Sequence, residues 1–172
     1  MADRFGRPSW DDYFMALIMV ATTRSIDDRT KHGCVIVDGR NRILSMGYNG
    51  PLRGALDDNV PTTSPEKYPW MEHSERNAVY NSQVSLEGAT AYITGHPCVE
   101  CFRALHQSGV KRIVFGPIVS SSHFESDKDK AIIKEMLIGQ DIKFEEYKGN
   151  LWEVFDIMET YLETKGITNE KE

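Results

Sequence analysis

Cys98 and Cys101, three positions apart in the stretch GHPCVEC, are residues whose type and spacing could do chemistry. They follow Pro97 directly, and the sequence around them predicts the opening turn of a helix. Helix N-termini carry unsatisfied N–H groups and a positive potential, which favour thiolates over thiols. Taken alone, the pair is compatible with a disulfide, a redox dithiol, part of a zinc site or two inert core cysteines.

A third metal ligand is available upstream at His73, where the stretch HSERNAVYN predicts another helix start. A catalytic zinc site uses three protein ligands and leaves the fourth position open. With Glu75 two residues further on, the chain carries the order His-x-Glu … Pro-Cys-x-x-Cys, which is the signature of zinc-dependent nucleoside and nucleobase deaminases. This conjunction favours His73, Cys98 and Cys101 as zinc ligands over the other uses of the cysteines.

The ligand set predicts a hydrolytic reaction at C4 of a cytosine-like ring. Zinc lowers the pKa of a bound water to about 7, so that a hydroxide is available at neutral pH. Glu75 is not needed as a ligand, and we predict that it takes the water proton, delivers it to N3 and later protonates the departing amine as ammonia. The alternative is a surface glutamate on the first turn of a helix.

Composition bounds the remaining possibilities. A chain of 172 residues, of which 40% are hydrophobic, predicts one globular domain over residues 1–166 and a frayed tail over 167–172. The longest apolar stretch, 13–21, is too short to cross a bilayer, and the charged N-terminus lacks the apolar core of a secretory signal. Three cysteines are too few for a disulfide scaffold, which favours a cytoplasmic protein without membrane partners.

Hydrophobic patterning predicts five strands interleaved with five helices, and hence a three-layer α/β/α sandwich around a five-stranded mixed sheet. The expected strands are 34–38, 42–48, 89–95, 111–116 and 141–147. The expected helices follow Ser9, His73 and Cys98 and then cover 127–139 and 151–166. Residues 49–70, with four prolines, predict a long surface loop, and 117–126 predict a polar loop. Apolar residues near helical spacing indicate that the last helix covers either its own sheet or a neighbouring copy, with burial in its own core the expected use: Leu151, Trp152, Phe155, Met158 and Leu162.

These motifs resemble those of the cytidine/deoxycytidylate deaminase superfamily, and most of all those of its deoxycytidylate (dCMP) deaminases. The resemblance covers roughly residues 10–147 and rests on HGCVIVDGRNRILSMGYNGPLRG, HSERNAVYNS and GHPCVECFRALHQSGVKRIVF. It implies the mixed sheet of the cytidine deaminase type, one catalytic Zn²⁺ per chain, and hydrolysis of dCMP to dUMP with release of ammonia. Because residues 55–70 contain no Cys or His, the second zinc of some relatives is not expected.

The segment GYNGPLRG supplies candidates for binding the sugar and base. Asn49 is the candidate for a sugar hydroxyl or the base, because its amide both donates and accepts hydrogen bonds. A turn residue before Gly50 is the alternative. Tyr48 beside it, and Ser74, which replaces the family's usual alanine, complete the candidates on this side.

For a substrate phosphate, Arg24 with Ser25 is the candidate, since the resemblance places the family's phosphate contacts near this helix–strand junction. Arg29, Lys31 and Arg53 are alternatives, and each on its own is more typical of a solvated surface charge.

The resemblance also implies partners and effectors. It implies a homo-oligomer, with a hexamer favoured, and dCTP and dTTP as effectors, the triphosphate carrying Mg²⁺. Alternative substrates are 5-substituted dCMP, dCTP and deoxycytidine. A nucleic-acid deaminase would be expected to have a basic face, whereas this chain has a net charge of −6. A zinc module that lost catalysis is disfavoured because Glu75 is present.

Overall fold

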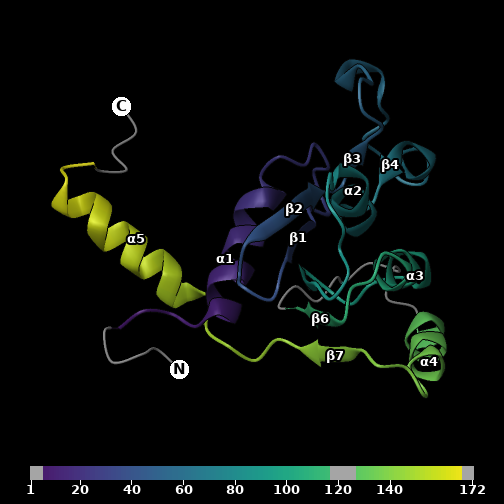
Figure 1. Cartoon of the computed structure of the whole chain (residues 1–172). Helices are drawn as coiled ribbons and strands as arrows, with labels where there is room; N and C mark the ends of the chain where they lie inside the picture. The colour runs from purple at the N-terminus through teal and green to yellow at the C-terminus, as the bar shows by residue number, and fades with distance from the viewer. Residues whose placement is uncertain (1–5, 117–126, 168–172) are drawn as a thin grey trace.

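The computed structural model describes residues 6–116 and 127–167 (Figure 1). The long elements, in chain order, are α1 (Trp10–Thr22), β1 (Gly33–Val37), β2 (Ile43–Tyr48), α2 (Ser74–Asn81), β5 (Thr90–Ile93), α3 (Val99–Gln107), β6 (Arg112–Phe115), α4 (Asp127–Met136), β7 (Lys143–Glu146) and α5 (Trp152–Thr164). The predicted polar loop and all of the predicted tail except Ile167 lie outside the described residues. The extent of the domain stays a prediction.

The five long strands form one sheet in the order β2-β1-β5-β6-β7. β1 pairs antiparallel with β2 and with β5, whereas β5, β6 and β7 run parallel. The antiparallel pair is a hairpin because only a short turn separates β1 from β2, and the parallel strands follow helical crossovers through α3 and α4. The predicted mixed α/β sheet is therefore confirmed.

Strand β1 shows why the sheet is covered on both faces. All five of its residues are buried, and successive side chains point to opposite faces. Cys34 and Ile36 join a cluster with residues of α2, α3 and α4, while Val35 and Val37 join a second cluster with α1. A strand with two apolar faces needs a helical layer on each side, and this gives the three layers.

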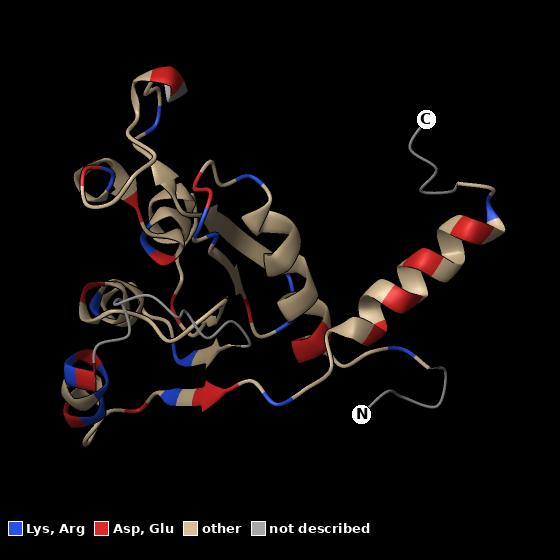
Figure 2. Cartoon of the chain, turned by 180° about the vertical axis from the view of Figure 1, so that it is seen from behind, with Lys and Arg blue, Asp and Glu red and all other residues tan. Residues whose placement is uncertain are grey.

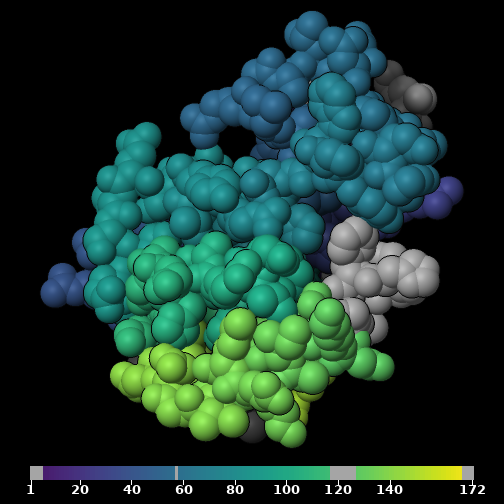
Figure 3. Space-filling view, turned by 90° about the vertical axis from the view of Figure 1, so that its right-hand side faces the viewer, coloured from purple at the N-terminus to yellow at the C-terminus, as the bar shows by residue number. Residues whose placement is uncertain are grey.

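The predicted surface loop over 49–70 is largely irregular, but its ends are paired. A short strand β3 (Gly50–Pro51) pairs antiparallel with β4 (Met71–Glu72), and between them lie two 3₁₀ turns, η1 (Asp57–Asn59) and η2 (Tyr68–Trp70). The long connection therefore leaves and returns at the same place, one residue before His73. Figure 3 shows this segment as the blue atoms at one end of the molecule, next to the teal atoms of α2.

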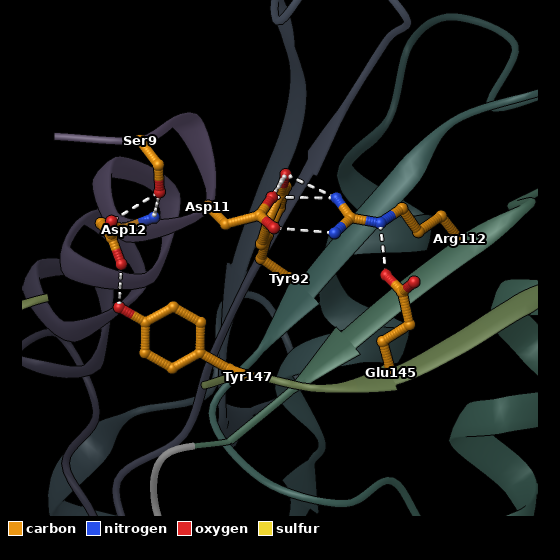
Figure 4. Close-up of polar contacts among 7 residues, drawn as sticks. All are labelled: Ser9, Asp11, Asp12, Tyr92, Arg112, Glu145 and Tyr147. Atoms are coloured by element: carbon orange, nitrogen blue, oxygen red, sulfur yellow. Dashed lines mark hydrogen bonds and ion pairs between the residues drawn. The ribbon is translucent and has the colours of Figure 1, made fainter. Parts of the chain in front are cut away.

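Two neighbouring carboxylates hold the start of α1 against the sheet (Figure 4). Asp11 makes a bidentate pair with Arg112 on β6, at 2.9 and 2.7 Å, and accepts the hydroxyl of Tyr92 on β5 at 2.6 Å. Asp12 accepts the hydroxyl of Tyr147 and the backbone N–H of Asn150, both of which follow β7. The Arg112 hydrogen bonds are the main cause that holds the pKa of Asp11 below its usual value.

The prediction that α5 buries against the core was wrong. Only Leu151, at its N-cap, is buried, while Val154 and Phe155 in the first turn pack beside α1. The rest of the helix projects from the body (Figure 1). The physical reason is that α1 already covers this face of the sheet, and Asp12 holds the linker before α5 at the beginning of α1.

Charge is unevenly distributed on α5. Its acidic residues, shown in red in Figure 2, are Glu153, Asp156, Glu159 and Glu163, and the helix contains no Lys or Arg. In the described part of the chain, no helix has the length and apolar character needed to cross a membrane.

Candidate metal centre and active site

Two helix starts carry the predicted metal ligands. His73 is the N-cap of α2 and Cys98 is the N-cap of α3, and neither side chain makes a capping hydrogen bond. Ser, Thr, Asp or Asn normally occupies this position because a side-chain oxygen then satisfies an exposed N–H. His and Cys at both N-caps leave their side chains available to another partner. Pro97 directly precedes the N-cap Cys98, so it lies just before α3.

The three predicted ligands meet in space. Nδ1 of His73 lies 3.6 Å from Sγ of Cys98 and 3.4 Å from Sγ of Cys101, and the three atoms all lie within 4.8 Å of one another. Two sulfurs and one imidazole nitrogen form a donor set that suits zinc, and three ligands leave a fourth position open. The residues therefore fit a catalytic zinc ion.

The thiols of this cluster are strongly perturbed. The pKa of Cys98 is lowered to about 5. The hydrogen bond from Cys101 is the largest cause of this shift. Burial acts in the opposite direction, and the hydrogen bond from His73 lowers the pKa further. The pKa of Cys101 is raised, chiefly by the same bond to Cys98 and then by its burial. The pKa of His73 is raised mainly by its hydrogen bond to Cys98. Negative charge is thus favoured on the sulfur of Cys98, beside Nδ1 of His73.

Glu75 lies beside the ligands and is buried, with 8% of its surface exposed. The hydroxyl of Ser74 donates to its Oε2 at 2.9 Å, and Ser74 itself is only 1% exposed. Ser74, which the sequence placed among the substrate-binding candidates, therefore orients the carboxylate of Glu75. Cys34, the third cysteine, is buried in β1, and its pKa is raised first by burial and then by the charge of Glu75.

Helix α2 lies flat on the edge strand β2. A Cβ atom at Gly47 would come within 2.3 Å of the Ser74 carbonyl oxygen and 2.4 Å of the Ala78 nitrogen, so only glycine permits this approach. Asn77 and Asn81, one helical turn apart, donate to the backbone carbonyls of Tyr48 at 2.9 Å and Met46 at 3.1 Å. The helix that carries His73 and Glu75 is thereby fixed against the sheet.

Sequence reasoning missed these supporting residues. A glycine inside β2 and two asparagines four positions apart in α2 were the available signals, but neither says which residue it faces. Glu72 was missed as well. Its Oε1 accepts the backbone N–H of His73 at 3.0 Å and pairs with Arg76 at 2.5 Å, so it satisfies part of the α2 N-terminus.

Asn49 is buried, and both ends of its amide are engaged by the backbone. Its Oδ1 accepts the N–H of His32 at 2.7 Å, and its Nδ2 donates to the carbonyl of Thr30 at 2.7 Å. One lone pair and one proton of the amide remain for a ligand. Asn49 thus helps to hold the backbone around it, which is close to the alternative that it is a turn residue before Gly50.

The other substrate-binding candidates differ in exposure. Arg24 is exposed just beyond the C-terminal end of α1, and Tyr48 has 38% of its surface exposed. Ser25 is buried; its Oγ accepts the N–H of Asp27 at 3.2 Å and its carbonyl accepts Nζ of Lys31 at 2.5 Å. Arg53 reaches away to Oδ1 of Asn81 at 2.5 Å. Both guanidinium groups are exposed, and the bond of Arg53 to Asn81 makes Arg24 the better candidate for a phosphate.

Comparison with known proteins decides the family. The family described as the cytidine and deoxycytidylate deaminase zinc-binding region matches residues 8–117, which is well over half of the chain. The chain belongs to the cytidine and deoxycytidylate deaminase family. All three predicted metal ligands and Glu75 lie inside the matched region.

Relatives in this deaminase family are found in animals and in a phage. The deoxycytidylate deaminase of Homo sapiens is 33% identical over 129 residues, which cover 71% of each chain. That of Mycobacterium phage D29 is 36% identical over 123 residues, covering 63% of this chain and 95% of the phage protein. The dCMP deaminase of cyanophage S-TIM5, solved with dCMP and dUMP, has the same fold. The superposition covers 82% of this chain and 98% of the cyanophage chain, with a TM-score of 0.62 at 22% identity.

Proposed function

We propose that this protein catalyses the zinc-dependent hydrolytic deamination of dCMP to dUMP, with release of ammonia. The observation that carries the proposal is the convergence of His73, Cys98 and Cys101 at two helix starts, with the buried carboxylate of Glu75 beside them. The names of the relatives supply the substrate class, since the deoxycytidylate deaminase of Homo sapiens is 33% identical to this chain over 129 residues.

In this proposal the chain holds zinc through Nδ1 of His73 and the two thiolates of Cys98 and Cys101. When bound, zinc supplies the Lewis acidity that makes water a nucleophile at neutral pH. Glu75 accepts one proton of the attacking water and delivers it to N3 of the cytosine ring. It then takes the second proton from the hydroxyl now on C4 and gives it to the amino group, so that the C4–N bond breaks, ammonia leaves and the C4 carbonyl forms. Ser74 keeps the carboxylate aimed during these transfers, because its hydroxyl occupies Oε2.

Specificity for a monophosphate is assigned to Arg24 and the turn that follows it. A guanidinium meets a phosphate dianion bidentately, and such contacts work in a protein whose overall charge is negative. The remaining lone pair and proton of Asn49, together with the hydroxyl of Tyr48, are available for the sugar or base. The two residues adjoin α2 through the Tyr48 carbonyl, which Asn77 binds.

Several finer expectations, from the composition and from the family resemblance, stay predictions. They are a cytoplasmic location, a homo-oligomer with a hexamer favoured, and dCTP and dTTP effectors with Mg²⁺ on the triphosphate. We propose that the oligomer uses α5, because the helix exposes large apolar side chains that a second copy would cover. Ile157, Met158 and Tyr161 lie on one face of the helix, and Trp152 is exposed at its start.

A deamination screen tests the proposal. The loss of cytosine absorbance would be followed for deoxycytidine, dCMP, dCTP, 5-methyl-dCMP and a cytosine-containing oligonucleotide. We expect dCMP to have the highest kcat/KM. A higher value for deoxycytidine or for the oligonucleotide would replace the proposal with a nucleoside or nucleic-acid deaminase.

A further inference from the structure

A buried ion pair joins two segments that are 40 residues apart. Nζ of Lys67 lies 2.6 Å from Oδ2 of Asp27, and the two side chains are only 7% and 5% exposed. The other ion pairs seen within the described residues are far more open, as in the pair of Arg42 and Asp38 with 70% and 18% exposed. A charge pair removed from water is costly unless its geometry is good and further hydrogen bonds satisfy its remaining atoms.

Asp27 uses its second oxygen to shape the turn in which it lies. Oδ1 accepts the backbone N–H groups of Arg29 and Thr30, both at 2.9 Å, while the N–H of Asp27 donates to Oγ of Ser25 at 3.2 Å. One carboxylate thus organises residues 25–32, which we call the 25–32 turn, and also holds Lys67. Burial by itself would raise the pKa of Asp27, but these bonds, led by the one from Lys67, hold that pKa below its usual value.

The long connection after β2 is attached to this turn at both ends. At its beginning, Asn49 binds the N–H of His32 and the carbonyl of Thr30. Near its end, Lys67 binds Asp27. Residues 52–66, which we call the 52–66 loop, therefore leave and return against the same turn.

The same connection leads directly to the metal ligands. The two ends of the long connection are joined by the pairing of β3 with β4, and Lys67 lies between these strands in the sequence. His73 is the residue after β4. Lys67 therefore lies between a loop at the surface and the strand that delivers the first zinc ligand. Arg24, the proposed phosphate ligand, precedes the 25–32 turn by one residue.

We propose that Asp27 and Lys67 are positioning residues, which hold the 52–66 loop against the 25–32 turn so that the phosphate-binding groups are in place before the nucleotide arrives. This inference rests on the proposed function for its substrate. Neither residue touches the reacting atoms. The pair acts on the binding of the phosphate end and leaves the proton transfers at Glu75 unchanged.

The double variant Asp27→Asn/Lys67→Met tests the proposal. The introduced asparagine retains an Oδ1 for the two turn N–H groups, and the neutral pair leaves no unpaired buried charge. We expect KM for dCMP to rise by about tenfold, because one charge-assisted contact with the phosphate is displaced. The kcat for dCMP should stay within about twofold of that of the unmodified protein. KM for deoxycytidine should stay within about twofold, because that substrate has no phosphate. Lys67→Gln, which keeps a hydrogen-bond donor, should give an intermediate KM.

Hydrogen exchange separates this inference from the proposed function, because it needs no turnover. The amides of the 52–66 loop should exchange faster in both variants, and those of α3 should not. Arg42→Met, which removes the cation of the exposed pair, is the matched control and should change neither KM nor exchange. Folded variants with unchanged KM for dCMP and unchanged exchange would overturn the inference. Absence of dCMP turnover in the unmodified protein would instead overturn the proposed function, while faster exchange would still support the role of the pair in holding the loop.

Discussion

The hydroxyl of Ser74 donates a hydrogen bond of 2.9 Å to the carboxylate of its neighbour Glu75, and both side chains are buried. The bond lies on the first turn of α2, immediately after His73. A carboxylate that must take and give protons at fixed atoms works best when its orientation is set by a neighbouring group. Two consecutive residues therefore supply both the proposed proton carrier and the group that orients it.

Glu75→Gln should remove nearly all turnover while zinc and the fold remain. A general acid–base group contributes about 10²- to 10⁴-fold, and here one residue serves several proton transfers. Ser74→Ala, which removes only the orienting bond, should reduce kcat by no more than about tenfold. Steady-state kinetics and metal analysis of the two variants check these expectations. A Glu75→Gln variant that keeps more than about a tenth of the original kcat would exclude Glu75 as the proton carrier.

One tightly held zinc per chain is expected in protein purified without chelators. Cys98→Ser and Cys101→Ser should each lower the zinc content, because each removes one of three protein ligands. Cys34→Ala should leave it unchanged, because Cys34 is a core residue of β1. Plasma emission spectrometry measures the metal, and zinc that persists undiminished in both serine variants would contradict the ligand assignment.

Arg24→Ala should narrow the preference for dCMP over deoxycytidine. Loss of a charge-assisted contact with the phosphate changes kcat/KM by about 10- to 100-fold, whereas deoxycytidine makes no such contact. Arg40→Ala, which removes an exposed guanidinium in the turn between β1 and β2, is the matched control. If the ratio of the two kcat/KM values were the same in Arg24→Ala as in the unmodified chain, the phosphate would have to be bound elsewhere.

Acid should weaken the contact between α1 and the sheet through Asp11. The pKa of Asp11 is lowered in the folded protein, so the ion pair with Arg112 contributes stability above the unfolded value of about 3.9. That contribution is lost as the pH falls through the lowered pKa. Thermal unfolding midpoints of the unmodified chain and of Asp11→Asn should therefore differ near pH 6 and converge once the pH falls below the lowered pKa of Asp11. A constant difference at all pH values would show that the carboxylate charge is not responsible.

The assembly prediction concerns the exposed face of α5. Met158→Glu combined with Tyr161→Glu places charges on this face and should shift the protein toward the mass of a single chain in light scattering. Glu159→Gln on the same helix is the control and should leave the mass unchanged. A monomeric unmodified chain at micromolar concentration would contradict the oligomer itself.

The sequence by itself determined the chemistry and most of the elements. The order His-x-Glu … Pro-Cys-x-x-Cys names residue types whose chemistry is intrinsic, and the helices and strands follow from local periodicity and capping. This is why the ligands, the base and the mixed sheet could all be predicted without coordinates. Strand β1 is an example, because five consecutive apolar residues already require a covered strand.

Only the tertiary structure decided how distant residues are used. The amide of Asn49 hydrogen-bonds the backbone of the 25–32 turn, and the hydroxyl of Ser74 donates to Glu75. Lys67 pairs with Asp27, which lies 40 residues away in the sequence. The direction of α5 depends on the linker that Asp12 holds. Contacts of this kind arise from packing between segments far apart in the chain, so no local pattern records which partner a side chain will meet.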